Sequence, residues 1–285
     1  MKINSGLALL LSIASGACLA SPLSINVYNP EQRGLFPVSS VLVSGDQHAI
    51  LFDAQFSPRD GEQLVRMIRN NGKPLQMIVI TSGDPDYYFG LEPLVRAFPA
   101  VKIVATRRVV DHINATREAK LAFWGPQMKQ GAPGKTYVPE VITRNQITLD
   151  GETIELRHPD NYAAYVWLPA SKTILGGTAV SWGIHVWSAD TQTTESRAQW
   201  RKILKEMQQL QPAQVIPGHY LGQRPAAGAA VTFTLRYLTD FETALAKNKH
   251  APGIISAMEA KWPHLEDPSA LELSAKVNSG EMRWQ

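Results

Sequence analysis

Hydrophobic and polar positions alternate along the first half of the chain in two different periods. Short apolar runs predict strands at 23–28, 39–45, 48–54, 75–81 and 102–106. Helices are predicted at 60–72, 90–98 and 106–125. In the first of these helices, Leu64, Val65 and Ile68 have the spacing of one helical face, and an Asn-Gly pair ends the segment. The turn before His48 makes the strands on either side of it a hairpin.

The second half repeats this plan. Further strands are predicted at 152–158, 163–169, 172–177 and 213–219. An amphipathic helix is predicted at 194–210, and from about residue 226 the chain is helical to its end, with breaks at Pro252 and Pro263. Two β-rich halves, each closed by helices, indicate two sheets packed face to face with helices outside.

The first twenty residues have a different pattern. One lysine near the start is followed by an apolar stretch and then by small residues that end at Ala20. This pattern is typical of a secretory signal and is too short for a membrane anchor. Cleavage after Ala20 predicts a periplasmic or secreted protein that begins at Ser21. The alternative is lipid attachment at Cys18, against which Ser15 stands where a lipobox normally has leucine.

Composition limits the remaining classes of function. The 285 residues are 44% apolar and 19% charged, which suits one globular domain over 21–285, with 226–285 as a helical extension. The formal net charge of +3 and the lack of a basic run give no indication of nucleic-acid binding. Cys18 is the only cysteine, so the processed chain has no disulfide. After signal cleavage we expect no membrane association, and the oligomeric state stays open.

Several short motifs occur in a characteristic order. The apolar strand at 75–81 runs into "TSGDPDYYFG", the strand at 172–177 ends in Gly-Gly, and the strand at 213–219 ends in Pro-Gly-His. This order resembles the metallo-β-lactamase superfamily over roughly residues 23–222. The resemblance implies an α/β fold, an αββα sandwich of two mixed β-sheets flanked by helices, here with a C-terminal helical extension.

The resemblance also implies roles for the loop after residue 80. The superfamily carries Thr-His-x-His-x-Asp-His at this place. Ser82 and Asp84 occupy the positions of the first two histidines, Asp86 matches the aspartate, and Tyr87 replaces the histidine beside it. Asp84 and Asp86 are therefore candidate metal ligands. An alternative interpretation is that Asp86 only caps the helix that follows it.

Distant residues complete the comparison with the superfamily. His219 matches its final metal-binding histidine, and His158 lies near its third. Thr178 replaces an aspartate that often bridges two metals. His185, in "GIHVWSAD", lies after the Gly-Gly loop and is a further candidate ligand, whereas Asp190 is a candidate helix cap. The other four histidines, at 48, 112, 250 and 264, are expected to be structural.

This set of side chains predicts one divalent metal ion rather than two. Aspartate in place of histidine makes the ligand set harder, which adds Mn²⁺, Fe²⁺ or Mg²⁺ as candidates beside Zn²⁺. A bound ion lowers the pKa of its water to about 7 and so supplies a hydroxide nucleophile. Asp86 and Tyr87 are assigned catalytic roles, the latter as a hydrogen-bond donor to an oxyanion. Contacts to a small-molecule substrate are assigned to Ser82, Tyr88 and Thr178.

Two functions follow from this comparison. The first is an exported hydrolase in which one metal activates water against an ester, lactone, thioester or amide. β-Lactamase activity itself is not expected, because most of the zinc-binding histidines are absent. The second is a non-catalytic member of the superfamily that binds a ligand or partner in the cleft after the loss of zinc ligands. Fold alone does not decide between them.

Overall fold

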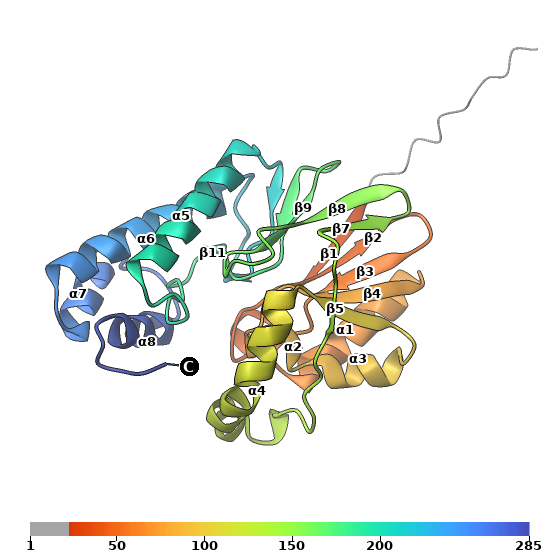
Figure 1. Cartoon of the computed structure of the whole chain (residues 1–285), viewed down its shortest axis with the longest axis horizontal. Helices are drawn as coiled ribbons and strands as arrows, with labels where there is room; N and C mark the ends of the chain where they lie inside the picture. Colours follow the sequence, from red (N-terminus) through yellow and green to blue (C-terminus); the bar gives the residue numbers. More distant parts are fainter. Residues whose placement is uncertain (1–22, 285) are drawn as a thin grey trace, which may run out of the picture.

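Two β-sheets lie face to face between two layers of helices, which confirms the expected αββα sandwich (Figure 1). The computed structural model describes residues 23–284. The predicted signal peptide, its cleavage after Ala20 and the alternative at Cys18 lie outside these residues. One sheet has six strands and the other five, and a separate pair of short strands lies beside them.

The first sheet follows the chain order from β1 to β6. Its strands are β1 (Ser24–Tyr28), β2 (Ser40–Ser44), β3 (Ala49–Phe52), β4 (Leu75–Ile80), β5 (Lys102–Ala105) and β6 (Glu140–Val141). β1, β2 and β3 are antiparallel, whereas β3 to β6 are parallel, so their carboxyl ends share one edge. The helices of this half are α1 (Pro58–Asn71), α2 (Pro85–Tyr88), α3 (Leu91–Ala97) and α4 (Arg107–Met128), with short turns η1 (Glu31–Arg33) and η2 (Lys129–Gly131).

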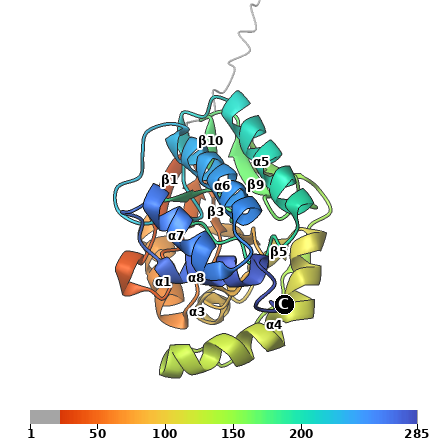
Figure 2. The ribbon, with the colours of Figure 1, turned by 90° about the vertical axis from the view of Figure 1, so that its left-hand side faces the viewer.

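The second sheet has the order β12-β10-β9-β8-β7. Its strands are β7 (Gln146–Leu149), β8 (Glu152–Arg157), β9 (Tyr165–Leu168), β10 (Thr173–Leu175) and β12 (Gln214–Val215). The two short strands β11 (Ser181–Trp182) and β13 (His219–Tyr220) pair in parallel. The helices of this half are α5 (Thr194–Gln209), α6 (Ala229–Lys247), α7 (Ala251–Lys261) and α8 (Pro268–Asn278). Figure 2, which faces these helices, shows α5 and α6 side by side.

Three hydrophobic cores match the layers. Successive residues of a strand point to opposite faces of its sheet, and β4 follows this rule. Val79 faces the core between the two sheets, whereas Ile78 and Ile80 face the core under α1 to α4. The third core lies between the second sheet and α5 to α8. The helical extension therefore packs on the domain rather than forming a separate unit.

Most expected elements are present, with shifted ends. α4 continues to Met128, three residues past the predicted end, and the helix expected at 90–98 is α3 preceded by the single turn α2. The expected strand at 213–219 is two short strands, β12 and β13, that belong to different sheets. β7 was not among the predicted strands. Its alternating pattern of exposed and buried residues is the signal that identifies it.

A buried hydrogen-bond chain joins the two sheets where β3, β4 and β10 end. The backbone N–H and the hydroxyl of Thr81 donate to the two carboxylate oxygens of Asp53, at 2.7 and 2.6 Å. The backbone N–H of Gly177 in turn donates to the Thr81 hydroxyl at 2.6 Å. Burial raises the pKa of Asp53 to about 8, against the lowering effect of the Thr81 hydrogen bonds. This chain fixes the loops that follow β4 and β10 against each other.

No helix in the span 23–284 is both long enough and apolar enough to cross a bilayer.

Replacing Thr81 with valine tests this hydrogen-bond chain. Thr81→Val keeps the shape but leaves an oxygen of Asp53 and the N–H of Gly177 without their partner. We expect a loss of about 1–3 kcal/mol in the free energy of unfolding, measured by urea denaturation. Thr148→Val, at an exposed position of β7, is the matched control and should change stability little. Equal stability of both variants would contradict the bridging role of Thr81.

Candidate functional site

A cleft lies between the loop that follows β4 and the C-terminal helices. Its ionisable side chains, apart from the phenol of Tyr162, are Asp84, Asp86, Lys120, His185, Asp190, His219 and Asp267. They come from α2 and the residue before it, from α4, from the segment between β11 and α5, from β13 and from the residue before α8. The cleft holds about 620 Å³ of space free of protein atoms, part of it open to solvent. Residues distant in sequence meet here because the carboxyl ends of β4 and β10 face the same edge.

The loop after β4 brings two carboxylates into this cleft. Asp84 has extended backbone angles, as expected for a residue before proline, and Pro85 begins the short helix α2. Asp86 lies within that helix, and its carboxylate turns to His219 instead of capping the helix. Both aspartates are more than nine-tenths buried. The expectation that Asp84 and Asp86 face one site is met, whereas the capping interpretation of Asp86 is not.

A short polar contact in the cleft joins Asp86 to His219. Their Oδ2 and Nε2 atoms are 2.5 Å apart, in surroundings that are largely buried. Burial alone would lower the pKa of His219, but the charge of Asp86 and the hydrogen bond to it raise that pKa above its usual value. Asp86 therefore favours the protonated form of His219, and the two side chains are committed to each other by this hydrogen bond.

Tyr87 occupies the other side of the same imidazole. Its hydroxyl donates to the carbonyl of Gly177 at 3.0 Å and lies 3.4 Å from Nδ1 of His219. Gly218 makes this packing possible, because a Cβ there would lie 2.6 Å from the Tyr87 oxygen and 2.0 Å from the Gly177 carbonyl. Both nitrogens of His219 thus face oxygen atoms of the protein. Tyr87 is fully buried, so it positions His219 and does not meet a substrate directly.

Asp84 is the less satisfied of the two carboxylates. Oδ2 accepts from the Ser82 hydroxyl at 3.1 Å, whereas the nearest basic atom to Oδ1 is Nε2 of His112, 3.8 Å away. Burial and the nearby charge of Asp190 raise the pKa of Asp84 to about 7. His112, expected to be structural, is thus a neighbour of the site. Burial lowers the pKa of that imidazole, so His112 is neutral near pH 7.

Asp190 organises the opposite side of the cleft. It accepts hydrogen bonds from the indole N–H groups of Trp187 and Trp284, the second at 2.9 Å. Its third partner is the buried ammonium group of Lys120, at 3.5 Å. Asp190 does not cap α5, since Thr193 does so in a capping box. Its role is to join α4 to the C-terminal segment.

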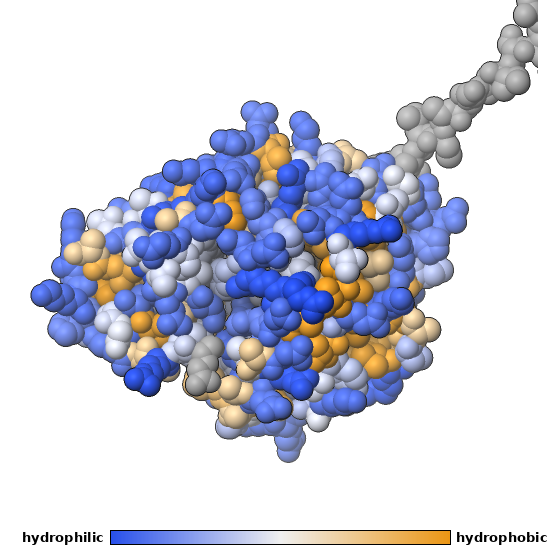
Figure 3. Space-filling model, in the orientation of Figure 1, coloured by the Kyte–Doolittle hydropathy of each residue, from blue (hydrophilic) through white to orange (hydrophobic). Residues whose placement is uncertain are grey.

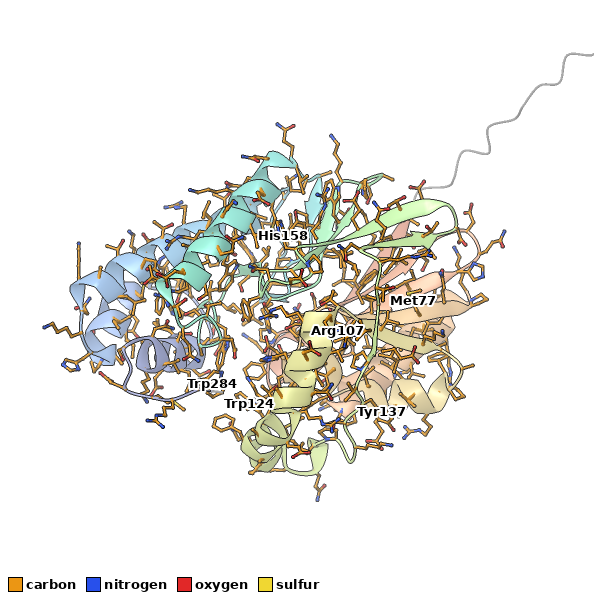
Figure 4. The ribbon with its side chains drawn as sticks, viewed as in Figure 1. Met77, Arg107, Trp124, Tyr137, His158 and Trp284 are labelled. Carbon is orange, nitrogen blue, oxygen red and sulfur yellow. The ribbon has the colours of Figure 1, made fainter. Side chains whose placement is uncertain are left out.

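Aromatic side chains make up most of the remaining wall of the cleft. They are Phe36, Phe56, Trp124, Tyr162, Trp187 and Trp284. Figure 4 shows Trp124 on α4 and Trp284 on the C-terminal segment at the opening between the two halves of the molecule. The face in Figure 3 is mainly hydrophilic, with hydrophobic residues in separate patches. No motif in the sequence marks these aromatic residues as a group, because they come from separate segments of the chain.

The residues assigned to substrate contact have different positions. Thr178 lines the cleft, as expected. Ser82 acts through Asp84, to which it donates. Tyr88 is fully buried in the core under α1 to α4 and does not line the cleft. Its substrate role is therefore withdrawn, because it has no surface to offer a ligand.

The two remaining candidate histidines lie in different grooves. His185 lines the cleft, with Nδ1 at 2.9 Å from the hydroxyl of Tyr237, and burial lowers the pKa of its imidazole. His158 lies in another groove, where Nε2 is 2.8 Å from Glu206 on α5. The positive φ of 53° at His158 turns the chain there. His158 is thus not part of the set around Asp86, and its assignment as a metal ligand is corrected.

The cleft residues as arranged do not fit a metal ion. Two ligands of one zinc, manganese or iron ion, each about 2.0–2.2 Å from it, lie at least about 3 Å apart. The 2.5 Å between Asp86 and His219 is the distance of a hydrogen bond. Across residues 23–284, no three His, Cys, Asp or Glu side chains are grouped to hold an ion. The position that would carry a further histidine is filled by the phenol of Tyr87.

Comparison with known proteins agrees with this architecture. Residues 33–219 match the family model described as the metallo-beta-lactamase superfamily. An uncharacterized protein of Bacillus subtilis (strain 168), YobT, is 30% identical over 122 residues, which are 42% of this chain and 49% of that protein. This match thus spans about half the length of the relative.

Solved structures share the fold at low sequence identity. A metallo-beta-lactamase from Pontibacter korlensis is 20% identical and superposes with a TM-score of 0.54, over 78% of this chain and 98% of that one. The DIM-1 metallo-beta-lactamase is 21% identical, with a TM-score of 0.48, over 77% of this chain and 98% of that one. At these identities the structural likeness concerns the fold alone.

Removing the charge of Asp84 should change the pH dependence of stability. The folded-state pKa of about 7 lies above the unfolded value, so folded Asp84 retains a proton that the unfolded chain loses as pH rises from about 4 to about 7. Stability therefore falls with rising pH. Asp84→Asn should remove this part of the slope and be more stable than wild type by on the order of 2 kcal/mol at about pH 8.

Chemical denaturation at about pH 5 and about pH 8 measures this effect, with pH values chosen on either side of the expected titration. Asp111→Asn, at an exposed position of α4, is the matched control and should keep the wild-type slope. If Asp84→Asn also keeps that slope, the pKa of Asp84 is not raised.

Proposed function

Since this chain belongs to the metallo-β-lactamase superfamily, we propose that its working site is the cleft around Asp86 and His219, and that it binds a small organic molecule there without a resident metal. The observation that carries the proposal is the hydrogen bond between these two side chains. It gives each group a hydrogen-bond partner and commits them to each other. The chain keeps a hydrolase-like fold, but the arrangement of its polar groups supports the binding of a ligand.

The rest of the cleft also supports a binding function. Its recess combines aromatic walls with a few polar groups, which is the usual make-up of a small-molecule site. Asp84 offers a free carboxylate oxygen, and Thr178 offers a hydroxyl. This is the second of the two functions that the sequence allows, with the ligand held by the side chains themselves.

A hydrolase acting on an ester, lactone, thioester or amide is the second candidate function. It is favoured by the meeting of Asp84, Asp86 and His219 in one cleft, as the sequence predicts. A carboxyl with a pKa of about 7, such as Asp84, is suited to accept a proton from water near neutral pH. For a single Zn²⁺, Mn²⁺ or Fe²⁺ ion to be held, His219 must first leave Asp86.

Metal analysis of the full mature chain separates the two candidates. We expect protein purified without metal-affinity resin to hold less than about 0.1 equivalent of zinc, manganese or iron by elemental analysis, even after supplementation, because the ligand atoms are hydrogen-bonded to each other. Asp86→Ala is the comparison variant. One equivalent of metal in wild type that disappears in Asp86→Ala would establish the metal-dependent hydrolase instead.

Export is part of this proposal and rests on residues 1–20 alone. The lysine near the start, the apolar stretch and the small residues up to Ala20 support cleavage before Ser21. We expect mass spectrometry of the protein recovered from the periplasm or medium to give a chain that starts at Ser21. A lipid-modified chain that starts at Cys18 would support the alternative, and an uncleaved cytoplasmic chain would exclude both.

A further inference from the structure

Carboxyl groups outnumber basic groups among the residues that line the cleft. Asp86 is paired with His219, and Asp190 with the ammonium of Lys120. Neither of these basic groups is left for a third carboxyl group. The net charge of the cleft therefore depends on its remaining carboxyl groups.

Asp84 and Asp267 are those remaining carboxylates of the cleft. Asp267 is engaged at the start of α8, where it accepts from Ser269 and from the backbone of Ala270. Asp84 is only 8% exposed, and within the described part of the chain no donor reaches its Oδ1 atom. A carboxyl oxygen that lines a cleft without a donor is a site for a cation or a donor from outside.

The aromatic walls of the same cleft already attract cations. The ammonium of Lys120 lies 4.7 Å from the ring centroid of Trp284, and the guanidinium of Arg108 lies 5.9 Å from that of Tyr162. The negative face of an aromatic ring favours a cation at such distances. Asp190 holds the N–H edges of Trp187 and Trp284, so the orientation of these two rings is fixed before a ligand arrives.

A second polar atom at the cleft lacks a partner. The hydroxyl of Tyr162 is buried beside the hydroxyl of Thr178 and makes no hydrogen bond of good geometry among residues 23–284. The Thr178 hydroxyl donates to the backbone carbonyl of Tyr162 at 3.4 Å. A buried hydroxyl without a good hydrogen bond is unfavourable unless a ligand supplies the missing partner. The cleft thus offers a donor at Tyr162 as well as the carboxyl group of Asp84, which is ionised above a pKa of about 7.

We propose that the cleft binds an organic ammonium cation, whose charge lies at Asp84 and whose alkyl or aryl groups lie against Trp187, Trp284 and Tyr162. An acceptor group on the same molecule would pair with the Tyr162 hydroxyl. This inference rests on the proposed function, since it names the class of molecule that the cleft takes. A strongly hydrated inorganic cation fits less well, because aromatic walls cannot replace its water shell.

A matched pair of ligands isolates the charge. Choline and 3,3-dimethylbutan-1-ol have nearly the same shape and the same hydroxyl, but only choline carries the positive charge. We expect isothermal titration calorimetry on the full mature chain to show choline binding at least about tenfold more tightly than the alcohol. Benzyltrimethylammonium, which adds an aromatic group, should bind more tightly than choline. The anion 3,3-dimethylbutanoate should not bind.

Two variants test the residues that carry the inference. Asp84→Asn and Trp284→Leu should each weaken choline binding by about fivefold to tenfold, with little effect on the alcohol. Asp111→Asn and Tyr137→Leu are the matched controls. Asp111 is exposed on α4, and Tyr137 carries its own cation contact with Lys135 away from the cleft. Neither control should change the dissociation constant.

The outcomes separate this inference from the proposed function. Equal binding of choline and its neutral isostere, or tighter binding of the anion, would overturn the cation class while leaving a metal-free binding cleft in place. Absence of binding by both ammonium probes at millimolar concentration would also overturn it. One bound metal equivalent in the elemental analysis overturns the proposed function itself, whatever the probes do.

Discussion

The hydrogen bonds among Asp53, Thr81 and Gly177 are the constraint on which the cleft depends. They join the ends of β3, β4 and β10 and thereby tie the two sheets together at one edge. Asp53 has a positive φ of 66°, a conformation that costs an L-residue about 1–2 kcal/mol. The paired carboxylate offsets that strain. Because Thr81 and Gly177 are held together, the loops that follow them both reach the cleft, where they supply Asp84 and Thr178.

Beyond these bonds, the polar groups around His219 are each held in position by a neighbouring group. Gly177 accepts from Tyr87, the Tyr87 oxygen faces His219, and His219 is bound to Asp86. A buried polar group without a partner is unfavourable, so a phenol in place of an imidazole must find an acceptor. It finds one in the backbone of the Gly-Gly loop. The superfamily's fold is thus retained with an interior that is held by hydrogen bonds among the protein's own side chains.

The cleft combines a rigid floor with walls from distant parts of the chain. α4 supplies Lys120 and Trp124, and the C-terminal segment supplies Trp284. Asp190 connects them, because its carboxylate holds both the ammonium and two indole N–H groups. The C-terminal helices therefore have a role beyond covering the second sheet. They bring an aromatic wall to a site whose floor comes from the loops after β4 and β10.

The sequence by itself determined the αββα sandwich, because the alternation of short apolar strands with amphipathic helices leaves few ways to bury both faces of two sheets. The resemblance of its motifs to the metallo-β-lactamase superfamily also implied that Asp84, Asp86 and His219 share one site. The tertiary structure alone decided that Asp86 binds His219, that His158 points elsewhere and that six aromatic residues line the cleft. Side-chain pairing in a buried site depends on distances of a few tenths of an ångström between residues far apart in sequence, and no local pattern records those distances.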